Sequence, residues 1–143
     1  MGTISKNFSY SEFEASETAK QRGIINVISD FAVRDAVKAL TLNVLQPLRS
    51  AWGAPLKINS GYRCPELNAA VGGAATSQHV KGEAADIDAR RPIKLAQLAY
   101  DMDLPFDQMI IYPNFVHFSH KHAGCQRKQV LYNKSYRGRH IKK

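Results

Sequence analysis

A histidine and an aspartate stand close together in one short segment whose fixed positions suit a metal site. Residues 77–86 read SQHVKGEAAD and fit the pattern S-x-H-x-x-G-x-A-x-D at every fixed position. His79 offers an imidazole nitrogen and Asp86 a carboxylate oxygen, and both atom types bind Zn²⁺. Gly82 and Ala84 are small enough to let the chain between the two ligands fold back closely. The sequence therefore predicts a zinc site built on His79 and Asp86.

A third protein ligand is needed, because catalytic zinc sites usually combine three protein ligands with an open position. His117 is the candidate, since it lies in residues 115–119, FVHFS, where strand alternation places it opposite its two apolar neighbours. A neighbouring strand that carries Asp86 would bring the ligands together. We therefore expect one Zn²⁺ ion held by His79, Asp86 and His117. Asp88 shares the face of Asp86 and is a rival ligand, but the spacing from His79 favours Asp86.

Several segments outside the motif add to this pattern. Residues 60–63 read SGYR upstream of it, and residues 115–117 read FVH downstream. NFSYSEF at 7–13, PELN at 65–68 and FDQ at 106–108 complete the set. Together they resemble the D-Ala-D-Ala metallopeptidases, whose superfamily also contains the lysostaphin-type enzymes and the hedgehog signalling domain. The resemblance covers nearly the whole chain and is nearest to the small phage-type branch that includes endolysins.

The resemblance implies a zinc-dependent peptidase in which the three predicted ligands hold the metal. Arg63 would reach the substrate carbonyl or a nearby carboxylate, and its guanidinium would stabilise the developing oxyanion. Hydrogen bonds from Ser77 or Gln78 would orient the ligands or the substrate. Glu83 is expected to be a solvated loop charge rather than a base.

The general base that would activate the attacking water is missing from the position where it is expected. Members of the family often carry an acid three residues before the last ligand, or a histidine two before it, where this chain has Asn114 and Phe115. Because an amide does not accept a proton at neutral pH, Asp107, His120 or the metal alone would activate the water. We favour Asp107, although strict alternation places it off the metal face unless a bulge intervenes. Tyr112 would donate to the oxyanion.

The elements that position these residues follow an α+β pattern. Helical spacing of apolar residues predicts the longest helix, which Pro47 interrupts or kinks near its end. The expected order is helix, strand, helix, strand, helix and hairpin, over residues 29–51, 56–60, 65–71, 84–89, 93–100 and 106–119. We expect a small antiparallel sheet that carries the zinc site and is backed by helices, as in the hedgehog and D,D-peptidase domains, within a single domain over residues 1–143.

The composition is that of a soluble globular protein, with 143 residues, 44% hydrophobic and 22% charged. The net charge of +8 favours a polyanionic partner. We favour the anionic cell wall, since nucleic acid is supported only by a basic C-terminal tail from about residue 127, in which Tyr132 and Tyr136 are interleaved. The tail is expected to be solvated, and the protein to be a monomer.

The sequence contains no run of about 18 apolar residues and therefore predicts no membrane-spanning helix. Residues 1–6, MGTISK, lack the apolar region of a secretory signal. We therefore expect synthesis in the cytoplasm without a signal peptide, and action in the periplasm or cell wall after holin-type or similar release. Cys64 and Cys125 are too few for a disulfide framework, and whether they pair after export stays open.

The favoured hypothesis is a zinc-dependent peptidoglycan peptidase of endolysin type that hydrolyses the stem peptide as an L-Ala-D-Glu endopeptidase. A D,D-carboxypeptidase or dipeptidase that acts at D-Ala-D-Ala is the alternative within enzymes. A non-catalytic zinc-containing wall-binding module, as in the hedgehog domain, is the alternative of another class. It is suggested by Asn114, which stands where an acid would be expected.

Overall fold

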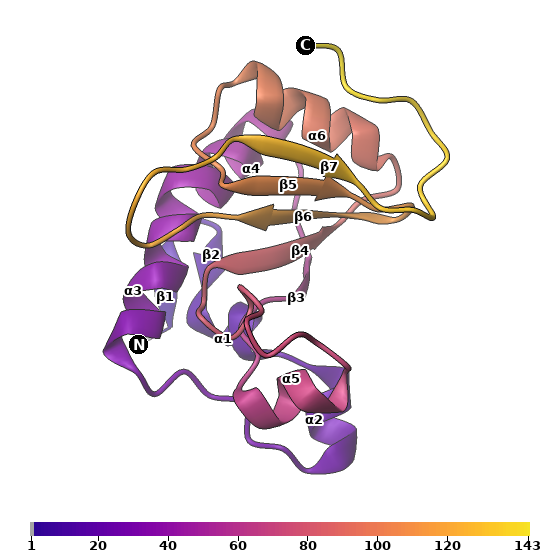
Figure 1. Ribbon diagram of the computed structural model, residues 1–143. Helices are drawn as coiled ribbons and strands as arrows, with labels where there is room; N and C mark the ends of the chain where they lie inside the picture. Colours follow the sequence, from indigo (N-terminus) through magenta and orange to yellow (C-terminus); the bar gives the residue numbers. More distant parts are fainter. Residues whose placement is uncertain (1) are drawn as a thin grey trace.

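In the computed structural model, which describes residues 2–143, a five-stranded sheet forms the frame of the molecule (Figure 1). In spatial order its strands are β3 (Ile58–Ser60), β4 (Ala84–Asp88), β6 (Phe115–Ser119), β5 (Gln108–Ile111) and β7 (Gln129–Tyr132). The α+β class is confirmed. The sheet is mixed rather than wholly antiparallel as expected, because the loop of residues 120–128 stays at the end of the sheet where β5 begins, and β7 then runs parallel to β5. Met1, where the expected domain begins, lies outside the described residues.

Alternation along the central strands gives the sheet two different faces. One face is fully buried and carries Ala85, Ile87, Met109, Ile111, Val116 and Phe118. The other face carries Asp86 and His117, which are direct cross-strand partners on β4 and β6. The prediction that the strand of Asp86 lies beside that of His117 is confirmed, and the sheet separates the core from the site.

A long helical segment and α6 (Pro92–Asp101) cover the apolar face (Figure 1). The long segment consists of α3 (Phe31–Leu40), the π-helix η1 (Thr41–Leu45) and α4 (Gln46–Trp52). It matches the predicted helix over 29–51, but Pro47 does not end it. The amide of Gln46 donates to the carbonyl of Thr41, and this π turn shifts the hydrogen-bond pattern just before the proline, which has no donor.

Short elements below the sheet position the turn that follows β3. They are β1 (Thr3–Ser5), β2 (Phe8–Ser9), α1 (Tyr10–Glu14), α2 (Glu17–Arg22) and α5 (Pro65–Ala70). Phe13 of α1 is fully buried, and a Cβ at Gly61 would lie 2.7 Å from its Cα atom. The amide of Tyr62 donates to the carbonyl of Phe13 at 2.8 Å. Glycine at residue 61 thus lets the chain pass close to α1, immediately before Arg63.

The C-terminal segment from residue 127 is anchored to the sheet and to α6, although most of its basic side chains are exposed, as expected for a solvated tail. Its first part forms β7 at the edge of the sheet. The ring of Tyr132 stacks on His140 with centroids 3.7 Å apart, and Ile141 is buried. Lys142 exchanges two hydrogen bonds with Gln97 of α6. The sequence of this segment reveals its positive charge. Its structure depends on strand pairing at the edge of the sheet and on these contacts, which the sequence does not reveal.

The structure also bears on the absence of a membrane-spanning helix and on the pairing of the two cysteines. Within residues 2–143, no helix is both long enough and apolar enough to cross a membrane. Cys64 and Cys125 are unpaired in this part of the chain. The Cys64 sulfur instead accepts a hydrogen bond from the amide of Leu67 at the start of α5. Cys64 is therefore used as a helix cap.

Gly82 supplies a test of how the motif loop packs on α3. Its φ is +74°, and an added Cβ would lie 2.7 Å from the carbonyl oxygen of Val33. Gly82→Ala should lower the free energy of unfolding by about 2–4 kcal/mol, because left-handed strain and overpacking add. Gly53→Ala is the control, since its φ of +76° meets no atom within 4 Å. Urea unfolding that gives equal losses for both variants would contradict this packing.

Candidate metal centre

Three predicted ligands converge on the polar face of the sheet. Asp86 and His117 come from paired strands, and His79 comes from the loop of residues 77–83, between α5 and β4. The amide of Arg63 donates to the carbonyl of His79 at 3.2 Å and fixes this loop against the turn after β3. One ligand atom of each of His79, Asp86 and His117 lies within 4.8 Å of the other two. Asp88 is exposed and outside this group within the described chain.

The carbonyl of Gly61 decides which nitrogen His79 presents to the group. His79 Nδ1 lies 2.7 Å from the Gly61 oxygen. A carbonyl oxygen only accepts, so Nδ1 must carry the hydrogen and donate. The lone pair of Nε2 then faces Asp86 Oδ1 at 3.4 Å. Buried His79 is thus held as the tautomer that binds metal through Nε2.

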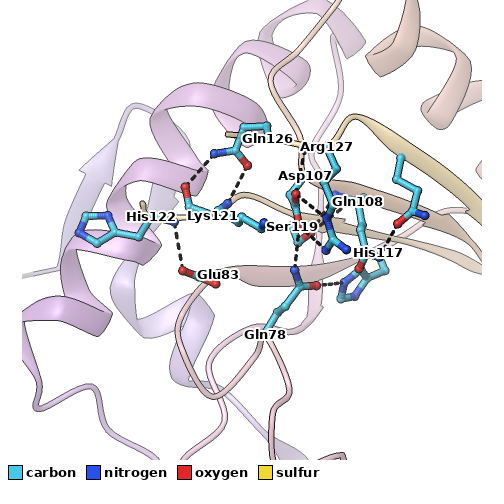
Figure 2. A network of polar contacts seen from close by, with 11 residues as sticks. Gln78, Glu83, Asp107, Gln108, His117, Ser119, Lys121, His122, Gln126 and Arg127 are labelled. Atoms are coloured by element: carbon cyan, nitrogen blue, oxygen red, sulfur yellow. Dashed lines mark hydrogen bonds and ion pairs between the residues drawn. The ribbon is translucent and has the colours of Figure 1, made fainter. Parts of the chain in front are cut away.

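Asp107 decides the tautomer of His117 through an intervening amide (Figure 2). The carboxylate of Asp107 only accepts, so Gln78 must turn its Nε2 toward it, at 3.2 Å. Gln78 Oε1 then faces His117 Nε2 at 3.3 Å, and this nitrogen must donate. The lone pair of His117 Nδ1 is left pointing at Asp86 Oδ1, 2.8 Å away. Gln78 is therefore a support of the metal ligand, as Ser77 or Gln78 was expected to be.

The resulting arrangement fits a cation. Two imidazole lone pairs and a carboxylate oxygen face one another, and such acceptors repel unless a positive charge lies between them. Asp86 supplies the negative charge of the group, because an aspartate carboxyl is ionised at neutral pH. Two imidazoles and one carboxylate, with an open side, suit Zn²⁺. The predicted ligand group is confirmed, and it fits one Zn²⁺ ion.

A cleft of about 640 Å³ opens beside the ligands, and Arg63 and Tyr112 line it. Arg63 is half-buried, and its Nε atom is buried without a hydrogen-bond partner in the described chain. Burial lowers the pKa of Arg63, while the charge of Asp86 opposes this. Burial and Asp86 together raise the pKa of Tyr112, which therefore keeps its proton at neutral pH. Both side chains carry hydrogen-bond donors in the cleft that contains the metal ligands, and their contacts with an oxyanion stay a prediction.

The structure places Asp107 where a general base would not work. Asp107 is fully buried and is not among the described residues that line the cleft. The side chain of Arg127 donates to it from Nε at 3.0 Å and from Nη2 at 2.7 Å. These bonds are the largest cause that lowers the pKa of Asp107, although burial opposes them. A carboxylate that is both committed and weakly basic does not fit the role predicted from the sequence.

The other predicted base is also outside the cleft. His120 is buried, and burial lowers its pKa. It is absent from the described residues that line the cleft. Glu83 does line it, and its Oε2 accepts from the amide of His122 at 3.0 Å. Glu83 is therefore a carboxylate at the cleft rather than only a solvated loop charge.

Arg127 is the site residue that the sequence analysis missed. Its place in a basic run led to its assignment to the tail, yet it lines the same cleft as the ligands. Nothing in the local sequence marks it, because its position depends on the loop of residues 120–128 and on buried Asp107. The carbonyl of Gly61 was missed for a similar reason, since backbone atoms have no sequence signal.

These features define the class of the protein as a zinc metallopeptidase. A family model for peptidase M15 matches residues 6–119, so the chain belongs to the peptidase M15 family. It is also 34% identical over 84 residues to the zinc D-Ala-D-Ala carboxypeptidase of Streptomyces albus G. This match covers 58% of the present chain but only 31% of that protein.

Gln78→Met should weaken zinc binding by about 10- to 100-fold, the usual effect of losing a group that supports a ligand. Methionine fills similar space but frees His117 Nε2 to lose its proton and compete as the lone-pair nitrogen. The affinity is measured by competition with a chromogenic chelator. Gln108→Met is the control, because Gln108 lines the same cleft but bonds to Gln129 instead. Equal zinc affinity of the Gln78 variant and the control would contradict the support role.

Acid should remove the contribution of Asp107 to stability. Its folded pKa lies below the usual value of about 3.9, so the contacts stabilise the protein above about pH 4 and are lost as pH falls through the lowered pKa. The free-energy gap between the zinc-free parent and Asp107→Asn should therefore shrink between pH 7 and about pH 3. Asp103→Asn is the control, since exposed Asp103 pairs with Lys128 at the surface. A pH-independent gap for Asp107→Asn would be inconsistent with this assignment.

Proposed function

We propose that the protein is a zinc-dependent peptidoglycan peptidase of endolysin type that cuts the stem peptide between L-Ala and D-Glu. The observation that carries the choice of an endopeptidase is the shape of the cleft. A second hollow of about 360 Å³ shares Arg63 and Asp86 with the main cleft and extends past Asn59 toward Glu17 of α2. Space on both sides of the ligands supports an endopeptidase, because its substrate continues in both directions from the scissile bond.

The residues around the metal would divide the chemistry between them. When bound, Zn²⁺ supplies a Lewis acid that polarises the scissile carbonyl and lowers the pKa of water. The Arg63 guanidinium would bind the carbonyl oxygen and stabilise its developing negative charge, which is more effective at a half-buried position than in water. Tyr112 would donate its phenolic hydrogen to the same oxygen. Neither Asp107 nor His120 lines the cleft, so Glu83 would be the carboxylate that accepts the proton.

A D,D-carboxypeptidase is the second candidate, and the relative from Streptomyces albus G favours it by name. The two reactions make similar demands on the site, since each cuts an amide whose nitrogen belongs to a D-amino acid with a free α-carboxylate. They differ in what lies beyond that residue. The stem peptide continues through the side-chain carboxyl of D-Glu, whereas terminal D-Ala has nothing further to accommodate. The main cleft of about 640 Å³ extends from the ligands past Gln108, Lys121 and Arg127, and this room for a continuing substrate favours the endopeptidase.

The proposal also includes the partner of the protein and the place where it acts. The net charge of +8 suits the anionic cell wall, so action in the periplasm or wall is expected. Nucleic acid is less well supported, because the rings of Tyr132 and Tyr136 in the C-terminal basic segment stack on each other. A non-catalytic module is also less well supported, since Arg63 and Tyr112 line the cleft together with the metal ligands.

Mass spectrometry of digested, purified wall fragments tests this proposal. The zinc-loaded protein should release fragments with a new amino terminus at D-Glu, and His79→Ala should release none. Removal of zinc by a chelator should abolish cleavage, and added zinc should restore it. Release of free D-Ala with the L-Ala-D-Glu bond intact would replace the endopeptidase by the carboxypeptidase. Equal, negligible digestion by the parent and by His79→Ala would favour the binding module.

A further inference from the structure

Arg127 is held rigidly at the rim of the cleft by a buried charge. Its side chain is 48% exposed, whereas that of Asp107 is fully buried. Three hydrogen bonds join the two residues, from the Arg127 backbone amide, Nε and Nη2, at 2.9, 3.0 and 2.7 Å. The guanidinium therefore meets the carboxylate along one edge, in the two-bond geometry that Arg-carboxylate pairs favour. This contact fixes where the other donors of Arg127 lie.

The remaining donors of Arg127 are available to a ligand. The Asp107 contact uses Nε and one hydrogen of Nη2, and Arg127 has no other side-chain hydrogen bond within residues 2–143. Nη1 and the second hydrogen of Nη2 are thus uncommitted on a residue that lines the cleft. These neighbouring N–H groups match the two oxygens of a carboxylate.

The charge of the cleft also favours an anion. Lys81 and Lys121 line it together with Arg127, and neither lysine forms an ion pair in the described part of the chain. Glu83 is the acidic lining residue that is not a metal ligand. The lining carries four cations, Arg63, Lys81, Lys121 and Arg127, against the acids Glu83 and Asp86. Even with the charge of Arg127 offset by Asp107, the cleft presents net positive charge beside the metal site. Such a field attracts and orients a negatively charged substrate group.

Arg127 is connected to the metal ligand His117 through a chain of contacts that runs over Asp107 and Gln78 (Figure 2). Gln78 bridges Asp107 and the ligand His117, with hydrogen bonds of 3.2 and 3.3 Å. One amide side chain therefore separates the carboxylate that holds Arg127 from a residue that holds the metal. Because Arg127 also lines the cleft that contains the ligands, an anion bound by Arg127 lies in the cleft that holds the bond to be cut.

We infer that Arg127 binds the free α-carboxylate of the substrate residue that follows the scissile bond, and that Asp107 is the positioning residue that orients its guanidinium. The inference rests on the proposed function for its substrate, D-Glu in the stem peptide. It does not depend on which of the two candidate bonds is cut, because terminal D-Ala carries its α-carboxylate at the same separation from the scissile carbonyl. A purely structural Arg127-Asp107 pair would not distinguish a substrate carboxylate from its amide.

Matched substrate pairs test the inference. One pair is a stem peptide with D-Glu and the same peptide with the α-carboxylate converted to a carboxamide. The second pair ends in D-Ala-D-Ala or in its terminal carboxamide. The zinc-loaded parent should show a kcat/KM at least about tenfold higher for the acid of the pair that it cleaves, consistent with a charge-assisted bond. No preference of the parent for the acid would overturn the inference.

Variants assign this preference to Arg127. Arg127→Gln should reduce the acid-to-amide ratio of kcat/KM at least about fivefold, chiefly through KM, and Arg127→Lys should give an intermediate ratio because it keeps the charge but loses the fork. Lys128→Gln is the control with the same charge change, since Lys128 pairs with Asp103 away from the cleft. It should keep the parent's ratio. An unchanged ratio in both Arg127 variants, with zinc content and thermal midpoint retained, would overturn the inference.

A binding measurement separates this inference from the proposed function. Analogues in which the scissile amide is reduced to a methyleneamine cannot be hydrolysed, and calorimetry gives their Kd for the zinc-loaded protein. The D-Glu analogue should bind at least about fivefold more tightly than its carboxamide, and Arg127→Gln should remove the difference. This result stands even if the endopeptidase assignment fails in the wall digest. Equal Kd values for the two analogues with the parent would reject the carboxylate site itself.

Discussion

The mutual repulsion of three acceptor atoms is the constraint on which the site depends. The lone pairs of His79 Nε2 and His117 Nδ1 face one oxygen of Asp86, which is unfavourable without a cation between them. The fold keeps them there by satisfying the opposite nitrogen of each imidazole, with a backbone carbonyl for one and a side-chain amide for the other. These two hydrogen bonds make the tautomers a property of the fold. The protein is thereby prepared for Zn²⁺ before the metal binds.

The buried carboxylate of Asp107 extends this constraint to the C-terminal part of the chain. A buried charge is costly unless hydrogen bonds and an opposite charge compensate it, and Asp107 receives both from Arg127 and a further bond from Gln78. The loop that carries Arg127 is thus tied to the loop that carries a metal ligand. This explains why residues after 119, which the family match does not include, belong to the structure of the cleft.

The surroundings of the metal suit a peptide substrate that bears a carboxylate. Arg63 and Tyr112 carry donors in the cleft beside the ligands, and the cations Lys81, Lys121 and Arg127 line the same cleft. Both candidate substrates, the L-Ala-D-Glu bond and terminal D-Ala-D-Ala, offer an amide carbonyl and a nearby α-carboxylate. What separates them is the space beyond the leaving residue, which is a matter of cleft shape rather than of metal chemistry. The same metal site therefore serves either specificity.

The sequence by itself determined the metal ligands and the class of fold. Residues 77–86 are close enough in the chain for residue type and spacing to define a site, and strand alternation around His117 fixed its face. The sequence favoured Asp107 as the base, but its burial and its ion pair with Arg127 do not fit that role, and neither feature can be read from a local pattern. Arg127 was missed for the same reason. Only the tertiary structure, through the parallel entry of β7 and the burial of Asp107, decided which distant charges meet at the cleft, because Coulomb and hydrogen-bond energies depend on separation in space and not along the chain.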